Sequence, residues 1–252
     1  MKTGLVLSGG GARACAHIGV LKALDEMNIK IDAISGVSAG AMVAAFYCAG
    51  VKTSEMLQLA HEIDLFRLRN FRIGRRGIFS ANVLSQLLEK HLHIKTFEEL
   101  KLPLTVASTD FIQGKTVYFN SGNLLNAIIA SSSIPAIFEP AFINGSMYVD
   151  GGLLNNLPVE PLVGKYEVII GSHVNPVATD VSDFGIINTI ERSFLLAIWN
   201  SVKGAAGLCS VYIEPAKLSR YHVFDLKHAK EMMEIGYQET MEQREKINTL
   251  YL

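Results

Sequence analysis

The sequence contains few cysteines, and none of them form a cluster. Cys15, Cys48 and Cys209 are spread over 252 residues, with no CxxC pair and no spacing typical of a metal site. An odd number of widely separated cysteines does not make a disulfide framework. We therefore expect free, buried thiols in a reducing compartment, and we predict no bound metal.

The chain also lacks an excess of charge of one sign and an unbroken apolar run long enough to span a membrane. Lysine and arginine number 23 against 24 acidic residues, so the net charge of −1 gives no general attraction to nucleic acid. The longest charge-free stretches, 33–51 and 116–138, are interrupted by Gly, Ser, Asn and Pro. The first residues are too few and wrongly flanked for a secretory signal. We expect a cytoplasmic protein without transmembrane helices or a nucleic-acid partner.

Hydrophobic residues make up 49% of the chain, enough for a sizeable core, and predicted strands and helices alternate through its first half. This alternation indicates parallel βαβ units covered by helices on both faces. We predict a single domain over residues 1–252. Strands are expected to end near Leu7 and Ser35 and to cover 103–110, 115–119, 147–150 and 168–174, with short ones near Val211 and Val223. Helices are expected over 12–27, 54–63, 81–92, 123–133 and 186–202. A further helix is expected to follow Ser38 and stop at Gly50, and another to begin at Ala229.

Ser38 stands at the centre of the pentapeptide Gly36-Val37-Ser38-Ala39-Gly40, between an apolar run and a helix-forming stretch. A serine on so tight a strand-to-helix turn is lifted clear of its neighbours, and the glycines let backbone pass close without a clash. The hydroxyl is then presented as a nucleophile. The alternative is a small residue packed in a turn, and the choice depends on partners elsewhere in the chain.

Two further features carry possible chemistry. Gly9, Gly10 and Gly11 lie where a strand passes into a helix, so their amides and the positive helix end can hold a phosphate or an oxyanion. Their spacing matches neither a P-loop nor a dinucleotide loop, and a nucleotide-binding module stays an alternative. Asp150 ends a predicted strand and is followed by two glycines, so its carboxylate can accept a proton from a hydroxyl.

Four blocks of the sequence together resemble the patatin-like phospholipase family in their order and approximate separation. They are Gly9-Gly10-Gly11-Ala12-Arg13, Gly36-Val37-Ser38-Ala39-Gly40, Ala130-Ser131-Ser132-Ser133-Ile134-Pro135 and Asp150-Gly151-Gly152. The resemblance covers residues from about 4 to 175. It implies a three-layer α/β/α sandwich with a mostly parallel central sheet. It also implies hydrolysis of acyl esters of lipids, of phospholipase A, lysophospholipase or esterase type, with no cofactor.

The resemblance further implies roles for particular residues. Ser38 would be the nucleophile and Asp150 its general base, forming a dyad without a catalytic histidine. The amides of Gly9, Gly10 and Gly11 would make an oxyanion hole, with Arg13 in the family's basic position. Ala14 follows that arginine, where the family usually has glycine.

Other assignments of the catalytic groups remain open at this point. Asp32 or Asp110 are rival bases, and Asp110 is the stronger rival because it ends a predicted strand. The order Ser38, Asp150, His173 is also that of an α/β-hydrolase triad. An alternative of a different functional class is a lipid-binding scaffold that keeps the fold without catalysis.

The segment 66–79 places five arginines among apolar residues. Such a mixture suits an anionic lipid surface, with arginines on headgroups and apolar side chains in the acyl boundary. We predict reversible, peripheral membrane contact through Phe71, Arg72, Arg75 and Arg76, or a lid over the site. The alternative is a solvated loop whose apolar side chains turn inward. The oligomeric state is not encoded in any motif.

Overall fold

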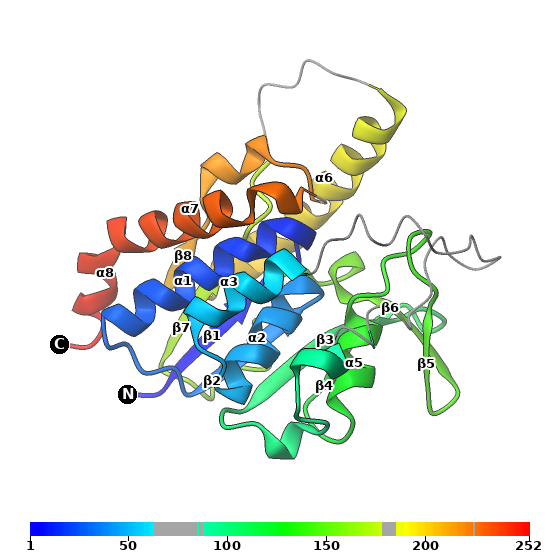
Figure 1. Ribbon diagram of the computed structural model, residues 1–252, viewed down its shortest axis with the longest axis horizontal. Coiled ribbons are helices and arrows are strands. Elements are labelled where there is room, and N and C mark those ends of the chain that lie inside the picture. The colour runs from blue at the N-terminus through cyan, green and yellow to red at the C-terminus, as the bar shows by residue number, and fades with distance from the viewer. Residues whose placement is uncertain (63–84, 86–87, 178–184, 224) are drawn as a thin grey trace.

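A mixed, mostly parallel sheet forms the centre of the computed structural model, which describes residues 1–62, 85, 88–177, 185–223 and 225–252 (Figure 1). The strand order is β5-β6-β3-β2-β1-β7-β8, and β4 pairs with β3 off this path. The strands are β1 (Thr3–Leu7), β2 (Ala33–Val37), β3 (Leu104–Asp110), β4 (Lys115–Phe119), β5 (Ala141–Ile143), β6 (Ser146–Asp150), β7 (Val168–Ser172) and β8 (Val211–Ile213).

Helices cover both faces of this sheet. The α-helices are α1 (Cys15–Glu26), α2 (Ala39–Ala49), α3 (Thr53–Glu62), α5 (Leu124–Ser131), α6 (Ile186–Ala206), α7 (Ala229–Glu242) and α8 (Arg244–Thr249). Short 3₁₀ segments are η1 (Gly11–Ala14), η3 (Phe97–Glu99), η4 (Gly151–Leu153), η5 (Ala216–Arg220) and η6 (Leu226–His228).

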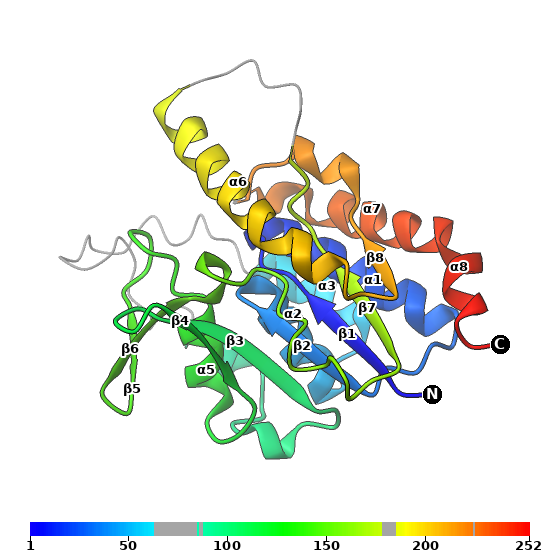
Figure 2. The same cartoon turned by 180° about the vertical axis from the view of Figure 1, so that it is seen from behind.

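The alternation of side chains along the central strands creates two cores. Leu5 and Leu7 point into a large cluster with side chains of α1, α2, α5 and α7. Val6, between them, joins a smaller cluster on the other face with Ile169, α6 and the segment 157–162. Figure 2 shows α6 in front of the sheet, on the side opposite the α1 and α7 pair of Figure 1. The predicted three-layer α/β/α architecture is confirmed.

Helices α1 and α7 pack backbone to backbone through two glycines. A Cβ on Gly19 would lie 1.9 Å from the Met233 carbonyl oxygen, and one on Gly236 would lie 2.1 Å from that of Ala16. Neither helix could approach so closely with any side chain at these positions. The contact fixes α1, and with it the glycine loop that precedes α1.

The sheet has a parallel part and an antiparallel part. Strands β2, β1, β7 and β8 pair in parallel, as do β2 and β3, whereas β4 and β6 pair antiparallel with β3. The hairpin of β5 and β6 turns at Asn144 and Gly145, whose φ angles of 49° and 81° are those that an Asn-Gly turn favours.

Some expectations were wrong or fall outside the described residues. Val223 lies in a turn rather than a short strand, because its carbonyl accepts a hydrogen bond from Ala12 N (2.7 Å) beside the glycine loop. Cys209 is half-buried, while the other two cysteines are buried. Half of the helix expected over 81–92 lies outside the described residues, and residues 85 and 88–91 are helical. The whole of 66–79, with Phe71, Arg72, Arg75 and Arg76, also lies outside the described residues. Among the described residues, no helix has the length and apolarity needed to cross a bilayer.

Candidate active site

The register of the sheet brings Ser38 and Asp150 together. Strand β4 pairs with the last five residues of β3 and therefore occupies one edge of it. Strand β2 pairs with β3 up to Ala107, and β6 pairs from Ser108 onward, so β2 and β6 meet end to end along the other edge. Val37 lies opposite Ala107 and Asp150 lies opposite Ser108. The residue after Val37, which is Ser38, must therefore come next to Asp150.

Ser38 has a strained backbone on the turn from β2 into α2. Its φ of 52° and ψ of −131° are rare for a residue with a side chain, and such strain costs about 1–3 kcal/mol. The Ser38 amide donates to Ser131 Oγ (2.7 Å), whose hydroxyl donates in turn to the Ala107 carbonyl (2.5 Å). Gly40 is required next, because a Cβ there would lie 2.3 Å from the Ser8 carbonyl oxygen.

The Ser38 hydroxyl donates directly to the Asp150 carboxylate. The distance from Oγ to Oδ2 is 2.6 Å, between residues 112 positions apart, and both residues are buried, with exposed fractions of 6% and 4%. The second oxygen, Oδ1, accepts from Gly152 N at 2.7 Å, and Asp150 N donates to the Ser133 carbonyl. The carboxylate is thus held by its own turn, and one oxygen faces the serine.

Burial raises the pKa of Asp150 from 3.8 to about 6, and its hydrogen bonds from Ser38 and Gly152 oppose this shift. A carboxylate with a pKa near 6 is still ionised at neutral pH. It also accepts a proton more readily than an exposed aspartate, as a general base should.

The glycine loop after β1 lies beside Ser38. A Cβ on Gly9 would lie 2.6 Å from Asn156 Oδ1 and 3.2 Å from Ser38 Cβ, so a glycine lets the loop pass this close to the serine. In the described part of the chain, the amides of Gly9, Gly10 and Gly11 donate to no protein acceptor. The loop therefore brings unengaged N–H groups to the neighbourhood of Ser38.

Arg13 is buried in η1, and its Nε donates to the Tyr221 carbonyl at 2.7 Å. This contact ties the start of α1 to the segment before η6. The side chain therefore supports the shape of the glycine loop.

The other candidates for the general base are hydrogen bonded to residues other than Ser38. Asp110 accepts from the amides of Ile112 and Gln113 in the turn after β3, and Asp32 accepts from Thr3 N at the opposite end of the sheet. His173 is fully buried, with Nδ1 2.7 Å from Glu214 Oε1. In the described ranges none of the three is hydrogen bonded to Ser38, and no group of three or more His, Cys, Asp or Glu side chains is placed to hold a metal.

Three polar residues of the site carried no usable signal in the sequence. Ser131 lies inside a quoted block, but only the structure shows that it holds the Ser38 amide. Asn156 and Asn175 are buried beside the Gly9 carbonyl, 147 and 166 positions from it in sequence. Lone asparagines after a turn or a strand are common, so spacing alone could not identify them.

A family model described as patatin-like phospholipase matches residues 5–163. The chain belongs to the patatin-like phospholipase family. It is 36% identical to an uncharacterized NTE family protein of Mycobacterium tuberculosis over 166 residues. This match covers 65% of this chain and 46% of the relative. It is 29% identical over 194 residues to the neuropathy target esterase sws of Drosophila melanogaster, covering 72% of this chain and 14% of that protein.

Among solved structures, the fold is similar to that of VipD from Legionella pneumophila, with a TM-score of 0.66 at 16% identity. The match covers 97% of this chain and 67% of VipD. The chain therefore spans less than half the length of the curated relatives above and most of the VipD chain.

Proposed function

We propose that this chain is a serine acyl hydrolase that cleaves carboxylic esters of lipids, with Ser38 as nucleophile and Asp150 as general base. The observation that carries the proposal is the 2.6 Å hydrogen bond from Ser38 Oγ to Asp150 Oδ2 at the end of β2. Membership of the patatin-like phospholipase family and the esterase name of one relative support a lipid ester as the substrate class.

The reaction proceeds through a covalent acyl-enzyme. Ser38 Oγ attacks the ester carbon while Asp150 takes the Ser38 proton, and the glycine amides stabilise the resulting oxyanion. The tetrahedral intermediate collapses by breaking the bond to the alcohol oxygen, which receives the proton from Asp150. Water then attacks the acyl group and gives one proton to Asp150. The bond from the acyl carbon to Ser38 Oγ breaks, Oγ takes that proton from Asp150, and the carboxylic acid leaves.

The dyad is favoured over a triad because the contacts of His173 run elsewhere. Its Nδ1 faces Glu214 and the Tyr212 hydroxyl, at 2.7 Å and 3.0 Å, and in the described residues its Nε2 has no hydrogen-bond partner. A catalytic histidine would need a hydrogen bond to the nucleophile. His173→Ala is therefore expected to retain acyl-enzyme formation, and a loss as deep as that of Ser38→Ala would favour the triad.

A panel of p-nitrophenyl esters, phospholipids and lysophospholipids tests the proposed reaction. Wild type should hydrolyse at least one class, and Ser38→Ala should lose that activity. Ser132→Ala is the matched control, because Ser132 is also buried and, in the described residues, its Oγ makes no hydrogen bond. Absence of hydrolysis in wild type with retained lipid binding would favour the scaffold alternative, and thermal stabilisation by nucleotides would favour the nucleotide-binding one.

Peripheral membrane contact belongs to the same proposal, and it rests on the composition of the segment 66–79. Arginines interleaved with apolar residues suit an anionic bilayer surface. Reversing the charges of Arg72, Arg75 and Arg76 should weaken sedimentation with anionic vesicles, and unchanged binding would contradict this part of the proposal.

A further inference from the structure

We propose that His17 and Asn175 are positioning residues that hold two consecutive carbonyls of the glycine loop and thereby aim the Gly9 and Gly10 amides at the reacting ester. The inference rests on the proposed function, since it assigns the origin of the oxyanion hole. Neither residue belongs to the four sequence blocks, and neither touches Ser38.

The first carbonyl is that of Ser8. His17 Nε2 lies 2.9 Å from it, and because a carbonyl only accepts, Nε2 must carry the proton. His17 Nδ1 then accepts from the Ser172 hydroxyl at 2.8 Å, which fixes the ring from the other side. Burial lowers the pKa of His17 to about 4, so this neutral tautomer persists at neutral pH.

The second carbonyl is that of Gly9, the next residue. Asn175 Nδ2 donates to it at 2.7 Å and Ser8 Oγ at 3.0 Å, while Asn156 Nδ2 lies at 3.5 Å, the limit of a weak contact. Asn175 is fully buried just after β7. One carbonyl is therefore held from α1 and the next from the end of a central strand.

Planarity of the peptide bond turns these two contacts into an orientation. In a trans peptide the N–H points away from the C=O of the same plane, and none of the described peptide bonds is cis. With the Ser8 carbonyl held by His17, the Gly9 N–H must point away from α1. With the Gly9 carbonyl held by Asn175, the Gly10 N–H must point away from Asn175. These are amides that donate to no acceptor in the described part of the chain.

Glycine makes such external support necessary. A run of three glycines rotates its peptide planes with little steric resistance, so hydrogen bonds from side chains to its carbonyls must fix the direction of its amides. A donor contributes to catalysis only when it is preorganised, and losing one oxyanion donor typically lowers turnover about 100- to 1,000-fold. Side chains from α1 and from the segment just after β7 supply that preorganisation.

The test compares Asn175→Ala with Asn155→Ala. Asn155 is the matched control, because it is also buried but its amide donates to Tyr118 and Glu160, away from the loop. We expect Asn175→Ala to lower kcat about 10- to 100-fold with KM nearly unchanged, while Asn155→Ala keeps wild-type kcat. Affinity for a trifluoromethyl ketone, which forms a tetrahedral oxyanion on serine, should fall in proportion to kcat/KM. Affinity for an unreactive ether analogue should not change.

His17 gives an independent second variant. His17→Gln keeps a donor near the position of Nε2, whereas His17→Ala removes it, so glutamine should restore most of the kcat that alanine loses. A purely structural role would lower the melting temperature without this rescue. Retention of kcat within about threefold in folded Asn175→Ala and His17→Ala would overturn the inference.

Failure of the proposed function is distinguishable from failure of this inference. If wild type hydrolyses no ester, the proposed function fails, and the peptide orientation is then tested by amide hydrogen exchange and ¹⁵N resonances. Changes at Gly9 and Gly10 in Asn175→Ala, absent in Asn155→Ala, would support the positioning role. Unchanged signals at both glycines would overturn it.

Discussion

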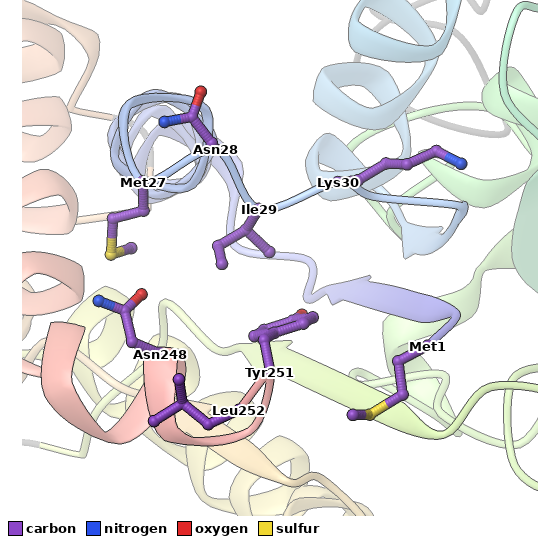
Figure 3. A pocket seen from close by; sticks show the side chains of 8 residues that line it. All are labelled: Met1, Met27, Asn28, Ile29, Lys30, Asn248, Tyr251 and Leu252. Carbon is purple, nitrogen blue, oxygen red and sulfur yellow. The ribbon is translucent and has the colours of Figure 1, made fainter.

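The two ends of the parallel strands differ in where they place strain and buried charge. At the amino end, a hollow of about 450 Å³ lies between the turn after α1 and the end of the chain after α8 (Figure 3). Two of the residues that line it have polar partners beside it: the Tyr251 hydroxyl lies 2.8 Å from Thr3 Oγ1, and Lys30 pairs with Asp32, which also accepts from Thr3 N. The positive φ of 56° there belongs to Asn28, a residue type that tolerates it.

The carboxyl end shows the opposite pattern. Ser38 holds a φ of 52° without the asparagine or glycine that would ease it, and Asp150 is buried with a raised pKa. Both features reduce folding stability, and they occur together where the serine meets the carboxylate. The backbone strain at Ser38 and the buried carboxyl of Asp150 therefore lie together at the carboxyl end of the strands, away from the hollow described at the amino end.

The largest expected effect comes from neutralising the buried carboxylate at the carboxyl end. Asp150→Asn should lower kcat about 100- to 10,000-fold, because an amide cannot accept the Ser38 proton. Asp110→Asn is the control, since Asp110 is about equally buried and, within the described ranges, its carboxylate accepts hydrogen bonds from its own turn alone. Its steady-state kinetics should therefore stay near wild type. Equal losses in the two variants would contradict the assignment of the base.

An intermediate effect is expected from pH. Only ionised Asp150 accepts a proton, so kcat/KM should fall about tenfold per pH unit below about 6 and level off above it. The effect of pH on folding stability has the opposite sign. The folded pKa exceeds the unfolded one, so the contribution of this carboxyl to stability is present below about pH 4 and is lost as pH rises through about 6.

Two pH series check both statements. The kinetic profile of wild type gives the first, and urea unfolding of wild type against Asp150→Asn gives the second. A rate that rises toward acid pH would exclude a carboxylate base.

The smallest effect is expected at the amino end. Tyr251→Phe removes the hydroxyl that meets Thr3 Oγ1 beside the hollow, and it should cost about 0.5–1.5 kcal/mol of unfolding free energy. Hydrolysis should be unchanged, because the contact lies at the far end of β1 from the nucleophile. A fall in kcat without a fall in melting temperature would break the contrast between the two ends.

Much of the architecture follows from the sequence, because hydrophobic alternation and Gly or Asn turns are local signals. The layers, the strand before Ser38 and the strand that ends at Asp150 were predicted in this way. The strand predicted near Val223 was wrong. Its apolar neighbours suggest a strand, but its carbonyl accepts a hydrogen bond from Ala12 N. Such a contact depends on tertiary structure and leaves no local pattern.

In the candidate site, too, residues in local motifs could be predicted and residues that depend on tertiary structure could not. Ser38, Asp150 and the glycines stand in motifs, and the structure brings Ser38 and Asp150 into contact, while their catalytic roles stay predictions. The supports could not be predicted, because Asn175 reaches Gly9 across 166 positions through the pairing of β1 and β7. Register between distant strands decides which polar side chains surround a motif, and a single sequence does not specify it.

Covalent labelling tests the central claim most directly. Wild type and Asp150→Asn are treated with a fluorophosphonate near pH 8, and the labelled peptide is identified by mass spectrometry. A single adduct on Ser38 that forms at least 100-fold more slowly in Asp150→Asn is the predicted result. Labelling of another serine, or equal labelling rates in the two proteins, would contradict a nucleophile activated by this carboxylate.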